Sequence, residues 1–495
     1  MKKTILLIAC LGLYFATEAQ KVYEFNAVCQ QAYHAIIQLR LNDGEALIAK
    51  ARQQNPNNLI PLLLESYIDF FTLFLNEDPA IYKVRKPAME HRIELLKEGP
   101  SSSPFYDYCL SDVYLHKAVI EMKFSETWSA AWDIRRAYQH IKDDRRNFPS
   151  FSPGGFLYGC LQAVTGTIPN GYKWLTNLLG LKGSLSAGMR TVHEFAYSND
   201  PWAKLMNNES AFVYCYLVYY LENKKDSALQ FIKDKHLDLV NNHLLAYMTT
   251  NLAKNNQQTE LAKTVLLNRN LSDAYLVTPV WDFEMGFIKL HHLELREAIV
   301  YFNRFIAHFK GKFYVKDVYQ KLSWCYYLEG NRSAADNARI NVLKKGSTDA
   351  DADKQALREA KSGRWPNPLL LKARLLNDGG YNSEALSLLK NKTFNSYPKV
   401  EEKLELTYRL ARLYDDLGKD KEAVPYYLQA IQWGQSRPEY YAHRAALQLG
   451  MMYEKLGEKA KAIAYYEKCL TITDSEYKNS LDQKAKSGIA RCKGE

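Results

Sequence analysis

The sequence predicts an all-α fold, in which stacked helical hairpins form a right-handed α-solenoid after an irregular helical N-terminal region. Alternating runs of β-branched residues are almost absent, and 24 Gly and 16 Pro are few for 495 residues, which disfavours a β fold. A pattern of small and large residues also occurs twice near the C-terminus, at a constant offset of 39 positions. The first copy contains Leu410, Ala411, Tyr414, Gly418, Ala423, Tyr427 and Ala430, and the second contains Leu449, Gly450, Tyr453, Gly457, Ala462, Tyr466 and Cys469.

The spacing of small residues extends this pattern toward the N-terminus. A small residue that opens the second helix of each hairpin recurs at Ala228, Ala262, Ala298, Ala335, Ala385, Ala423 and Ala462, with spacings of 34, 36, 37, 50, 38 and 39 residues. Stacked hairpins joined by loops of variable length produce such a drifting period. Any one copy alone is also compatible with an ordinary amphipathic hairpin, whereas seven copies near one register favour a solenoid.

This pattern resembles the tetratricopeptide repeat (TPR), a helix-turn-helix unit of about 34 residues. In that family, small residues let two helices approach closely, tyrosines fill the spaces between successive pairs, and a glycine ends the first helix. The resemblance is clearest over residues 404–470. It implies a non-enzymatic scaffold that binds a protein or peptide partner in the concave groove of the array. Together with the leader described next, it suggests an exported bacterial member of the family, of a Bacteroidetes-like kind.

Residues 1–19 are predicted to be a secretory signal peptide. Two lysines precede an apolar run from Thr4 to Phe15, and small residues at Thr17 and Ala19 predict cleavage before Gln20. The run is too short to remain as a transmembrane helix. We therefore expect export to the periplasm or cell envelope of a Gram-negative bacterium. A lipobox ends at Cys10, but the apolar run before it is short, which disfavours a lipoprotein.

Residues 20–200 are predicted to be helical but irregular, and resemble a degenerate array of TPRs. The segment from Ile60 to Leu75 is almost wholly apolar and is expected to form a buried helix. Residues 156–183 are expected to form an apolar hairpin with a turn at Pro169. Two interpretations of this hairpin are open: it joins two stretches of solenoid, or it forms a lip that contacts a membrane or a partner. No run of eighteen apolar residues occurs, so no transmembrane segment is expected.

Residues 201–350 are assigned to TPR-like repeats, and residues 351–495 to TPRs that end in a capping helix over 479–491. The long interval between Ala335 and Ala385 contains an extra segment, with a short helix predicted over 349–361. This segment begins like a calcium-binding loop. However, Lys354 stands where such a loop requires Gly, and Ala360 stands where it requires Glu. We therefore expect no calcium site.

The sequence contains no recognisable constellation of catalytic or metal-binding residues. The 11 histidines have no ligand spacing, and no phosphate loop, dinucleotide fingerprint or nucleophile motif occurs. Seven cysteines remain after Cys10; they are scattered singletons, which we interpret as small core residues. The net charge of about +9 without the leader is spread among acidic residues, which argues against nucleic acid as a partner. We predict no cofactor, no metal and no enzymatic activity, and the sequence leaves the oligomeric state open.

The candidate binding surface is the inner face of the solenoid, which the first helix of each hairpin lines. Aromatic residues are expected there in the middle copies and arginines in the later ones, which predicts a groove for an extended peptide with an acidic group. The candidate partner-binding residues are Trp324, Tyr327, Arg374, Asn377, Tyr408, Arg412, Asp415 and Arg444. The Lys and Asn of the carboxylate clamp in chaperone-binding TPR proteins are not reproduced at their positions. An aromatic groove also fits a second function, the binding of glycan, as in the helical-repeat lipoproteins of starch uptake.

Overall fold

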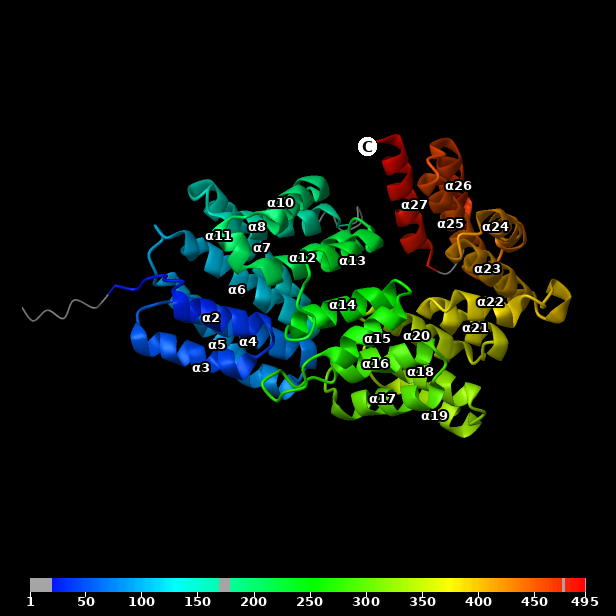
Figure 1. The fold of residues 1–495 in the computed structure, drawn as a ribbon, viewed down its shortest axis with the longest axis horizontal. Helices are drawn as coiled ribbons and strands as arrows, with labels where there is room; N and C mark the ends of the chain where they lie inside the picture. Colours follow the sequence, from blue (N-terminus) through cyan, green and yellow to red (C-terminus); the bar gives the residue numbers. More distant parts are fainter. Residues whose placement is uncertain (1–19, 169–178, 474–476, 495) are drawn as a thin grey trace, which may run out of the picture.

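Helices and the loops between them make up the described chain. The computed structural model describes residues 20–168, 179–473 and 477–494 (Figure 1), and within these ranges it contains no β-strand, only an isolated bridge between Val22 and Asn58. The all-α prediction is therefore confirmed. The predicted signal peptide and the Pro169 turn of the apolar hairpin lie outside the described residues. Among the helices that are described, none combines the length and the hydropathy needed to cross a bilayer.

The N-terminal region consists of paired helices of unequal length, coloured blue to cyan in Figure 1. They are α2 (Ala27–Ile37), α3 (Leu41–Gln54), α4 (Ile60–Asn76), α5 (Pro79–Lys97), α6 (Pro104–Lys123), α7 (Thr127–Asn147), α8 (Ser152–Gly166), α10 (Leu185–Tyr197) and α11 (Pro201–Leu205). As predicted, α4 is buried along almost its whole length. The next helix starts where Asp78 accepts hydrogen bonds from the amides of Ala80 and Ile81, with Pro79 in the first turn.

Seven helical hairpins follow and form the solenoid. They are α12 (Asn207–Tyr220) with α13 (Lys225–Asp234), α14 (His243–Asn255) with α15 (Thr259–Asn268), α16 (Val280–His291) with α17 (Leu295–His308), α18 (Val315–Leu328) with α19 (Arg332–Lys344), α21 (Pro368–Gly379) with α22 (Asn382–Leu389), α23 (Val400–Asp416) with α24 (Asp420–Gly434), and α25 (Tyr441–Lys455) with α26 (Lys459–Thr471). Three elements lie outside these pairs: α20 (Asp351–Ser362), the 3₁₀ turn η2 (Phe394–Ser396) and the final helix α27 (Lys478–Lys493).

The predicted repeat register is confirmed. Each of the seven alanines that mark the repeat lies in the second helix of a hairpin, and each has a solvent-exposed fraction of 0%. In the last two hairpins the tyrosines Tyr427 and Tyr466 are also fully buried. A Cβ atom on Gly450 would lie 2.5 Å from the Tyr466 ring, and one on Gly488 would lie 2.4 Å from it. The ring of Tyr466 is thus held between α25 and the capping helix α27, because both neighbours lack a side chain there.

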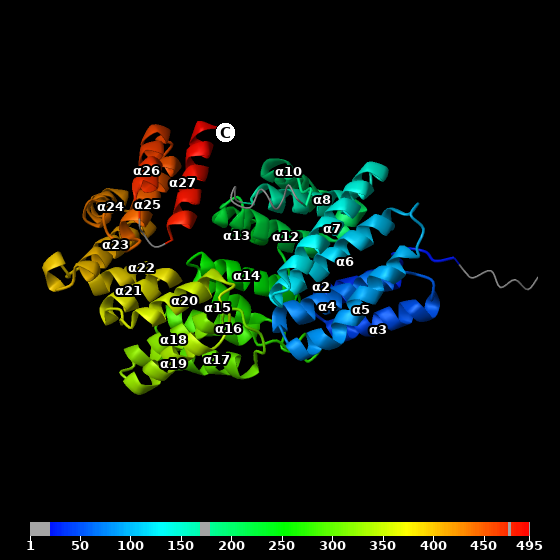
Figure 2. The ribbon, with the colours of Figure 1, turned by 180° about the vertical axis from the view of Figure 1, so that it is seen from behind.

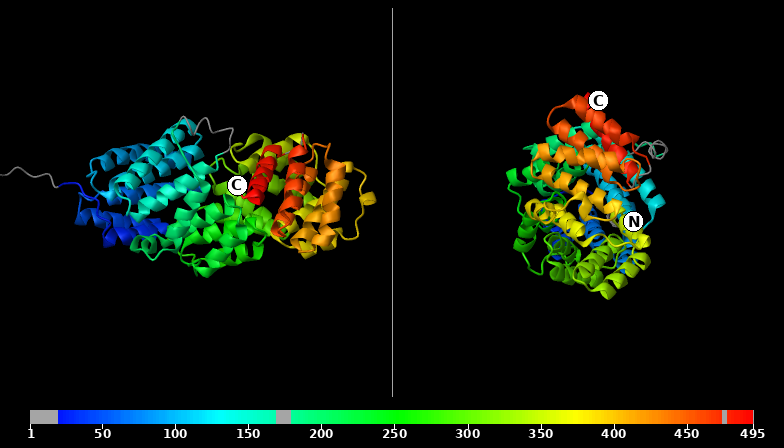
Figure 3. Two further views of the ribbon diagram at one scale, coloured as in Figure 1. Left: turned by 90° about the horizontal axis from the view of Figure 1, so that it is seen from above. Right: turned by 90° about the vertical axis from the view of Figure 1, so that its right-hand side faces the viewer.

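The solenoid bends back on itself, so that repeats far apart in sequence come into contact. The side-chain amide of Gln257, between α14 and α15, donates to Asp416 at the end of α23 (3.1 Å). The Tyr381 hydroxyl donates to Glu260 (2.6 Å). Figure 3 shows the C-terminal hairpins turning toward the middle of the chain, and Figure 2 shows α27 beside α13 from behind. A simple solenoid has contacts only between neighbouring repeats, so this closure is a specific feature of the chain.

The inserted helix α20 takes the place of a loop between two hairpins. It begins two residues later than predicted, at Asp351. Its Asp353 carboxylate accepts hydrogen bonds from the backbone amides of Tyr314 (2.7 Å) and Asp317 (3.0 Å) at the start of α18. Since the first amides of a helix have no partner within it, Asp353 caps a neighbouring helix. This role accounts for an acidic residue that resembled a calcium ligand in the sequence.

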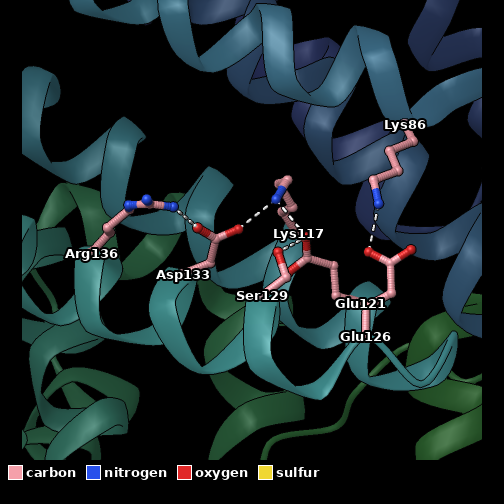
Figure 4. Close-up of polar contacts among 7 residues, drawn as sticks. All are labelled: Lys86, Lys117, Glu121, Glu126, Ser129, Asp133 and Arg136. Atoms are coloured by element: carbon pink, nitrogen blue, oxygen red, sulfur yellow. Dashed lines mark hydrogen bonds and ion pairs between the residues drawn. The ribbon is translucent and has the colours of Figure 1, made fainter. Parts of the chain in front are cut away.

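The core of the N-terminal region contains buried charges (Figure 4). Lys117 on α6, with a 9% exposed side chain, contacts the carboxylates of Glu121 (2.5 Å) and Asp133 on α7 (2.6 Å). Ser129 donates to Glu121 (2.8 Å), and Arg136 pairs with Asp133 (2.5 Å). Because each buried carboxylate has a cation or donor, this network holds α6 and α7 together.

Candidate binding groove

A cavity of about 980 Å³ occupies the inside of the bend. The first helices of all seven hairpins contribute to its lining, together with the end of α4 and the start of α13. This arrangement follows from the repeat, in which the first helix of each hairpin faces the concave side. The closure between α14–α15 and α21–α23 turns the open inner face of a solenoid into a partly enclosed groove.

One part of the groove is strongly basic. Lys225 at the start of α13, Arg412 on α23 and Arg444 on α25 line it together, and Lys484 on α27 lies close to Arg444. Burial lowers the pKa of Lys225, and the charges of Lys484, Arg412 and Arg444 lower it further. In the described part of the chain, no ion pair joins Lys225, Arg444 or Lys484 to a carboxylate. Like charges that lie close together favour the binding of an anion.

Two of the arginines that line the groove have acidic partners within their own helices. Arg374 lies 3.6 Å from Asp378, and Arg412 lies 3.0 Å from Asp416, each one helical turn away. Asn377 holds the Asp416 carboxylate from the side by donating a hydrogen bond (2.8 Å). These two guanidinium groups are therefore oriented and partly neutralised.

A second part of the groove lining is aromatic and carries side-chain amides. Tyr220 and Tyr314 are 53% and 42% exposed, so their rings are open to a ligand. The Tyr220 hydroxyl accepts a hydrogen bond from Asn255 (3.2 Å), and Asn251 donates to the buried Glu284 (3.0 Å). These two parts of the lining differ in chemistry: one suits an acidic group, and the other suits an apolar or aromatic side chain.

Trp324 lies in the groove wall but offers little surface. Its side chain is about 1% exposed, and its indole N–H donates to Glu359 on α20 (2.7 Å). The Lys321 ammonium lies 4.4 Å from the ring centroid, and the Arg374 guanidinium lies 5.2 Å from it. A ligand would therefore meet these cations before it met the ring, which acts as a platform for them.

The structure brings four of the eight candidate residues together in the groove lining: Trp324, Arg374, Arg412 and Arg444. The other four are not part of that lining. Tyr327 stacks on Trp365 with centroids 4.6 Å apart, and Asp415 accepts a hydrogen bond from Tyr427 (2.8 Å). Asn377 is 2% exposed and Tyr408 is 2% exposed. The expectation that Tyr408 points into the groove is wrong, because it packs among the rings of Tyr427, Tyr440 and Tyr441 in the hairpin core.

Several groove residues were missed in the sequence. Lys225, Tyr220 and Asn251 belong to the two repeats with the weakest small-residue pattern, and Lys484 belongs to the capping helix. The alanines of those weak repeats were recognised, so the inner positions of α12 and α14 were within reach of the same rule. The position of Lys484 was not, because only the bend of the solenoid brings α27 toward α13.

A second polar cluster lies in the core of the N-terminal region. Tyr33 and Tyr67 donate to the two oxygens of the partly buried Glu209 carboxylate (2.5 and 2.9 Å), and His116 lies 3.6 Å from Asp112. Burial raises the pKa of both Asp112 and Glu209 to about 7. The adjoining cavity holds only about 10 Å³, enough for a single water molecule at most. This cluster therefore has no room for a substrate in the structure described.

One of the comparisons with known proteins, the match to a family profile, agrees with the repeat pattern. The tetratricopeptide repeat family profile matches residues 404–433 and 443–475. These two segments are tetratricopeptide repeats. TPRs typically serve as scaffolds for interactions between proteins and typically carry no catalytic site. Among solved structures, the crystal structure of the P58(IPK) TPR domain is similar over 84% of this chain and 96% of that chain, with 14% identity and a TM-score of 0.22. The search of curated proteins found no match.

Proposed function

We propose that this protein is an exported, non-enzymatic scaffold that binds an acidic protein segment in the groove of its solenoid. The observation that carries the proposal is the basic part of the groove. Lys225, Arg444 and Lys484 come from three helices and lie close together, and none of them forms a salt bridge with a carboxylate among the described residues. An extended segment would place its carboxylates there and its apolar side chains against Tyr220 and Tyr314.

The test is a charge-matched pair of triple variants. Lys225→Ala, Arg444→Ala and Lys484→Ala together remove three charges from the groove. The control removes three exposed lysines outside it: Lys50, Lys421 and Lys459. Binding of fluorescent Glu- and Asp-rich peptides should weaken at least tenfold (about 1.4 kcal/mol) in the groove variant and change little in the control. The difference should shrink at high salt, because screening weakens the charge interaction. Equal affinity of both variants would contradict the proposal.

The three arginines that the sequence predicted for the groove provide a less selective test. Replacing Arg374, Arg412 and Arg444 by Ala removes two guanidinium groups that also hold Asp378 and Asp416. We therefore expect this variant to lose binding and also to lose some stability. The variant of Lys225, Arg444 and Lys484 should keep its stability, because it leaves Arg374 and Arg412 in place.

A glycan is the second candidate ligand. Tyr220 and Tyr314 are exposed rings beside amide side chains, which is the combination that stacks on and hydrogen-bonds to sugars. A glycan array run beside the peptide panel separates the two functions. Tyr220→Ala should abolish sugar binding if a glycan is the ligand, whereas the basic triple variant should leave it unchanged.

Export is part of the proposal and has its own test. The composition of residues 1–19 supports cleavage before Gln20 and a location in the periplasm or cell envelope. The intact mass of protein from the periplasm or the medium should lack residues 1–19. A diacylated Cys10 would instead show a lipoprotein.

A further inference from the structure

Three side chains with metal-binding atoms meet where the capping helix packs on the last repeat. His443 on α25 and Cys469 on α26 are fully buried, with 0% exposure, and Asp482 on α27 is partly buried. Their Nε2, Sγ and carboxylate oxygen atoms all lie within 4.8 Å of one another. The His443 Nε2 and Asp482 Oδ1 atoms are 3.1 Å apart. No motif in the sequence indicates this site, because the three residues lie 26 and 13 positions apart on three different helices.

We propose that His443, Cys469 and Asp482 bind one Zn²⁺ ion that fastens the capping helix to the last tetratricopeptide repeat. An imidazole nitrogen, a thiolate and a carboxylate form a mixed set that suits zinc. Tetrahedral bonds of about 2.0 Å place a nitrogen and an oxygen ligand about 3.3 Å apart, close to the separation present here. In the zinc complex the Cys469 Sγ atom would lie about 3.5 Å from the other two ligand atoms, and water would complete the coordination.

The neighbouring repeat shows how unusual these residues are at these positions. The repeat offset of 39 relates His443 to Leu404, Cys469 to Ala430 and Asp482 to His443. One repeat earlier, the corresponding positions therefore hold Leu404, Ala430 and a histidine, and the first two are fully buried in the apolar core. Packing alone is satisfied there by a leucine and an alanine. At the interface between the last repeat and α27, a thiol, an imidazole and a carboxylate occupy these positions, although packing alone does not require their polar atoms.

The Asp482 carboxylate is also oriented from outside the cluster. Lys478, one turn earlier on α27, donates to Asp482 Oδ2 (2.7 Å) and to the Ile472 carbonyl (3.2 Å). A hydrogen bond of this kind fixes the second oxygen of a metal-ligating carboxylate and leaves Oδ1 for the metal. One thiolate and one carboxylate balance the two charges of the ion. The thiol proton is released to solvent on binding, so affinity should rise with pH.

The experiment uses the full-length protein after removal of metal with a chelator. Co²⁺ is the spectroscopic probe, and a near-ultraviolet thiolate-to-cobalt absorption band should appear at one equivalent and disappear when Zn²⁺ is added. Zn²⁺ should also raise the melting temperature. Absence of the band, or of stoichiometric zinc by elemental analysis, would overturn the proposal.

The substitutions that test the zinc site are taken from the equivalent positions of the preceding repeat. Cys469→Ala and His443→Leu introduce the residues found at Ala430 and Leu404, so the fold should tolerate them. Each should weaken zinc binding at least a hundredfold. Cys492→Ala on α27 is the matched control, because it removes a buried thiol outside the cluster and should keep the cobalt band. If Cys469→Ala does not fold, Asp482→Asn gives the same test from a partly exposed position. Metal binding that survives both Cys469→Ala and Asp482→Asn would overturn the proposal.

Discussion

The N-terminal region and the last two repeats are both built from packed helices, but their cores differ in chemistry. Before residue 150 nine charged side chains are buried: Asp69, Glu77, Arg92, Asp107, Asp112, Lys117, Glu121, Asp133 and Asp144. In the described residues after 400, Arg409 is the one buried Asp, Glu, Lys or Arg. There, rings such as Tyr427 and Tyr466 pack against alanines and glycines instead.

This difference shows which kind of core can be recognised in a sequence. A repeat uses the same contact many times, so its small and large residues recur at a fixed offset. The N-terminal helices are joined by ion pairs that each occur once, and such pairs produce no repeated spacing in the sequence. The four predictions that follow test this contrast, in order of decreasing effect.

The largest effect is expected from removing the capping helix. Ending the chain at residue 474 deletes α27 and uncovers Tyr466, which now packs against Gly488. The exposed apolar face should cause aggregation, as expected for an uncapped solenoid. Size-exclusion chromatography measures this outcome, and removal of residues 494 and 495 alone is the control. A soluble, monomeric truncation would show that α27 is not a cap.

Two substitutions test the apolar core of the repeats. Tyr408→Ala leaves a cavity at a 2% exposed ring and should cost about 3–5 kcal/mol. Ala423→Phe places a ring at a site with 0% exposure and should cost about 1–3 kcal/mol or more through overpacking. Chemical unfolding measures both. The sequence placed Tyr408 on the groove face, where truncation of a side chain costs little folding energy. A small loss for Tyr408→Ala would agree with that placement and contradict the packing described here.

Lys117→Met tests the polar core of the N-terminal region. The substitution keeps the length of the side chain but leaves the buried carboxylates of Glu121 and Asp133 without their shared cation. We expect a loss of about 3–5 kcal/mol, in contrast to the value near zero that exposed pairs give. Lys97→Met is the control, because the Lys97–Glu94 pair is 40% and 67% exposed. Equal, small losses in both variants would mean that the buried network does not stabilise the region.

The smallest effect concerns pH. Burial raises the pKa of Asp112 from 3.8 to about 7 and that of Glu209 from 4.5 to about 7. The folded state therefore holds protons that the unfolded state has already released, so stability is full below about pH 4 and falls as pH rises toward 7. Asp112→Asn should be more stable than the wild type at pH 8 by about 1–3 kcal/mol and equal to it at pH 4. Parallel melting curves from pH 4 to 8 would contradict this assignment.

The sequence alone identified the repeat core. The spacing of small residues placed all seven alanines correctly, since close packing of two helices tolerates only small side chains at the contact. It also indicated that the first helix of each hairpin faces inward, and so found Trp324, Arg374, Arg412 and Arg444. It misplaced Tyr408, because a tyrosine near the inner face of α23 can equally turn into the core between hairpins.

Only the tertiary structure decided where the solenoid closes. The contacts between Gln257 and Asp416 and between Tyr381 and Glu260 join positions more than 120 residues apart. Small rotations between successive hairpins add up over the whole array, and no local pattern reports their sum. The accumulated rotation brings Lys225 and Lys484 close together. The packing of α27 on the last repeat likewise decides the meeting of His443, Cys469 and Asp482, because each residue comes from a different helix.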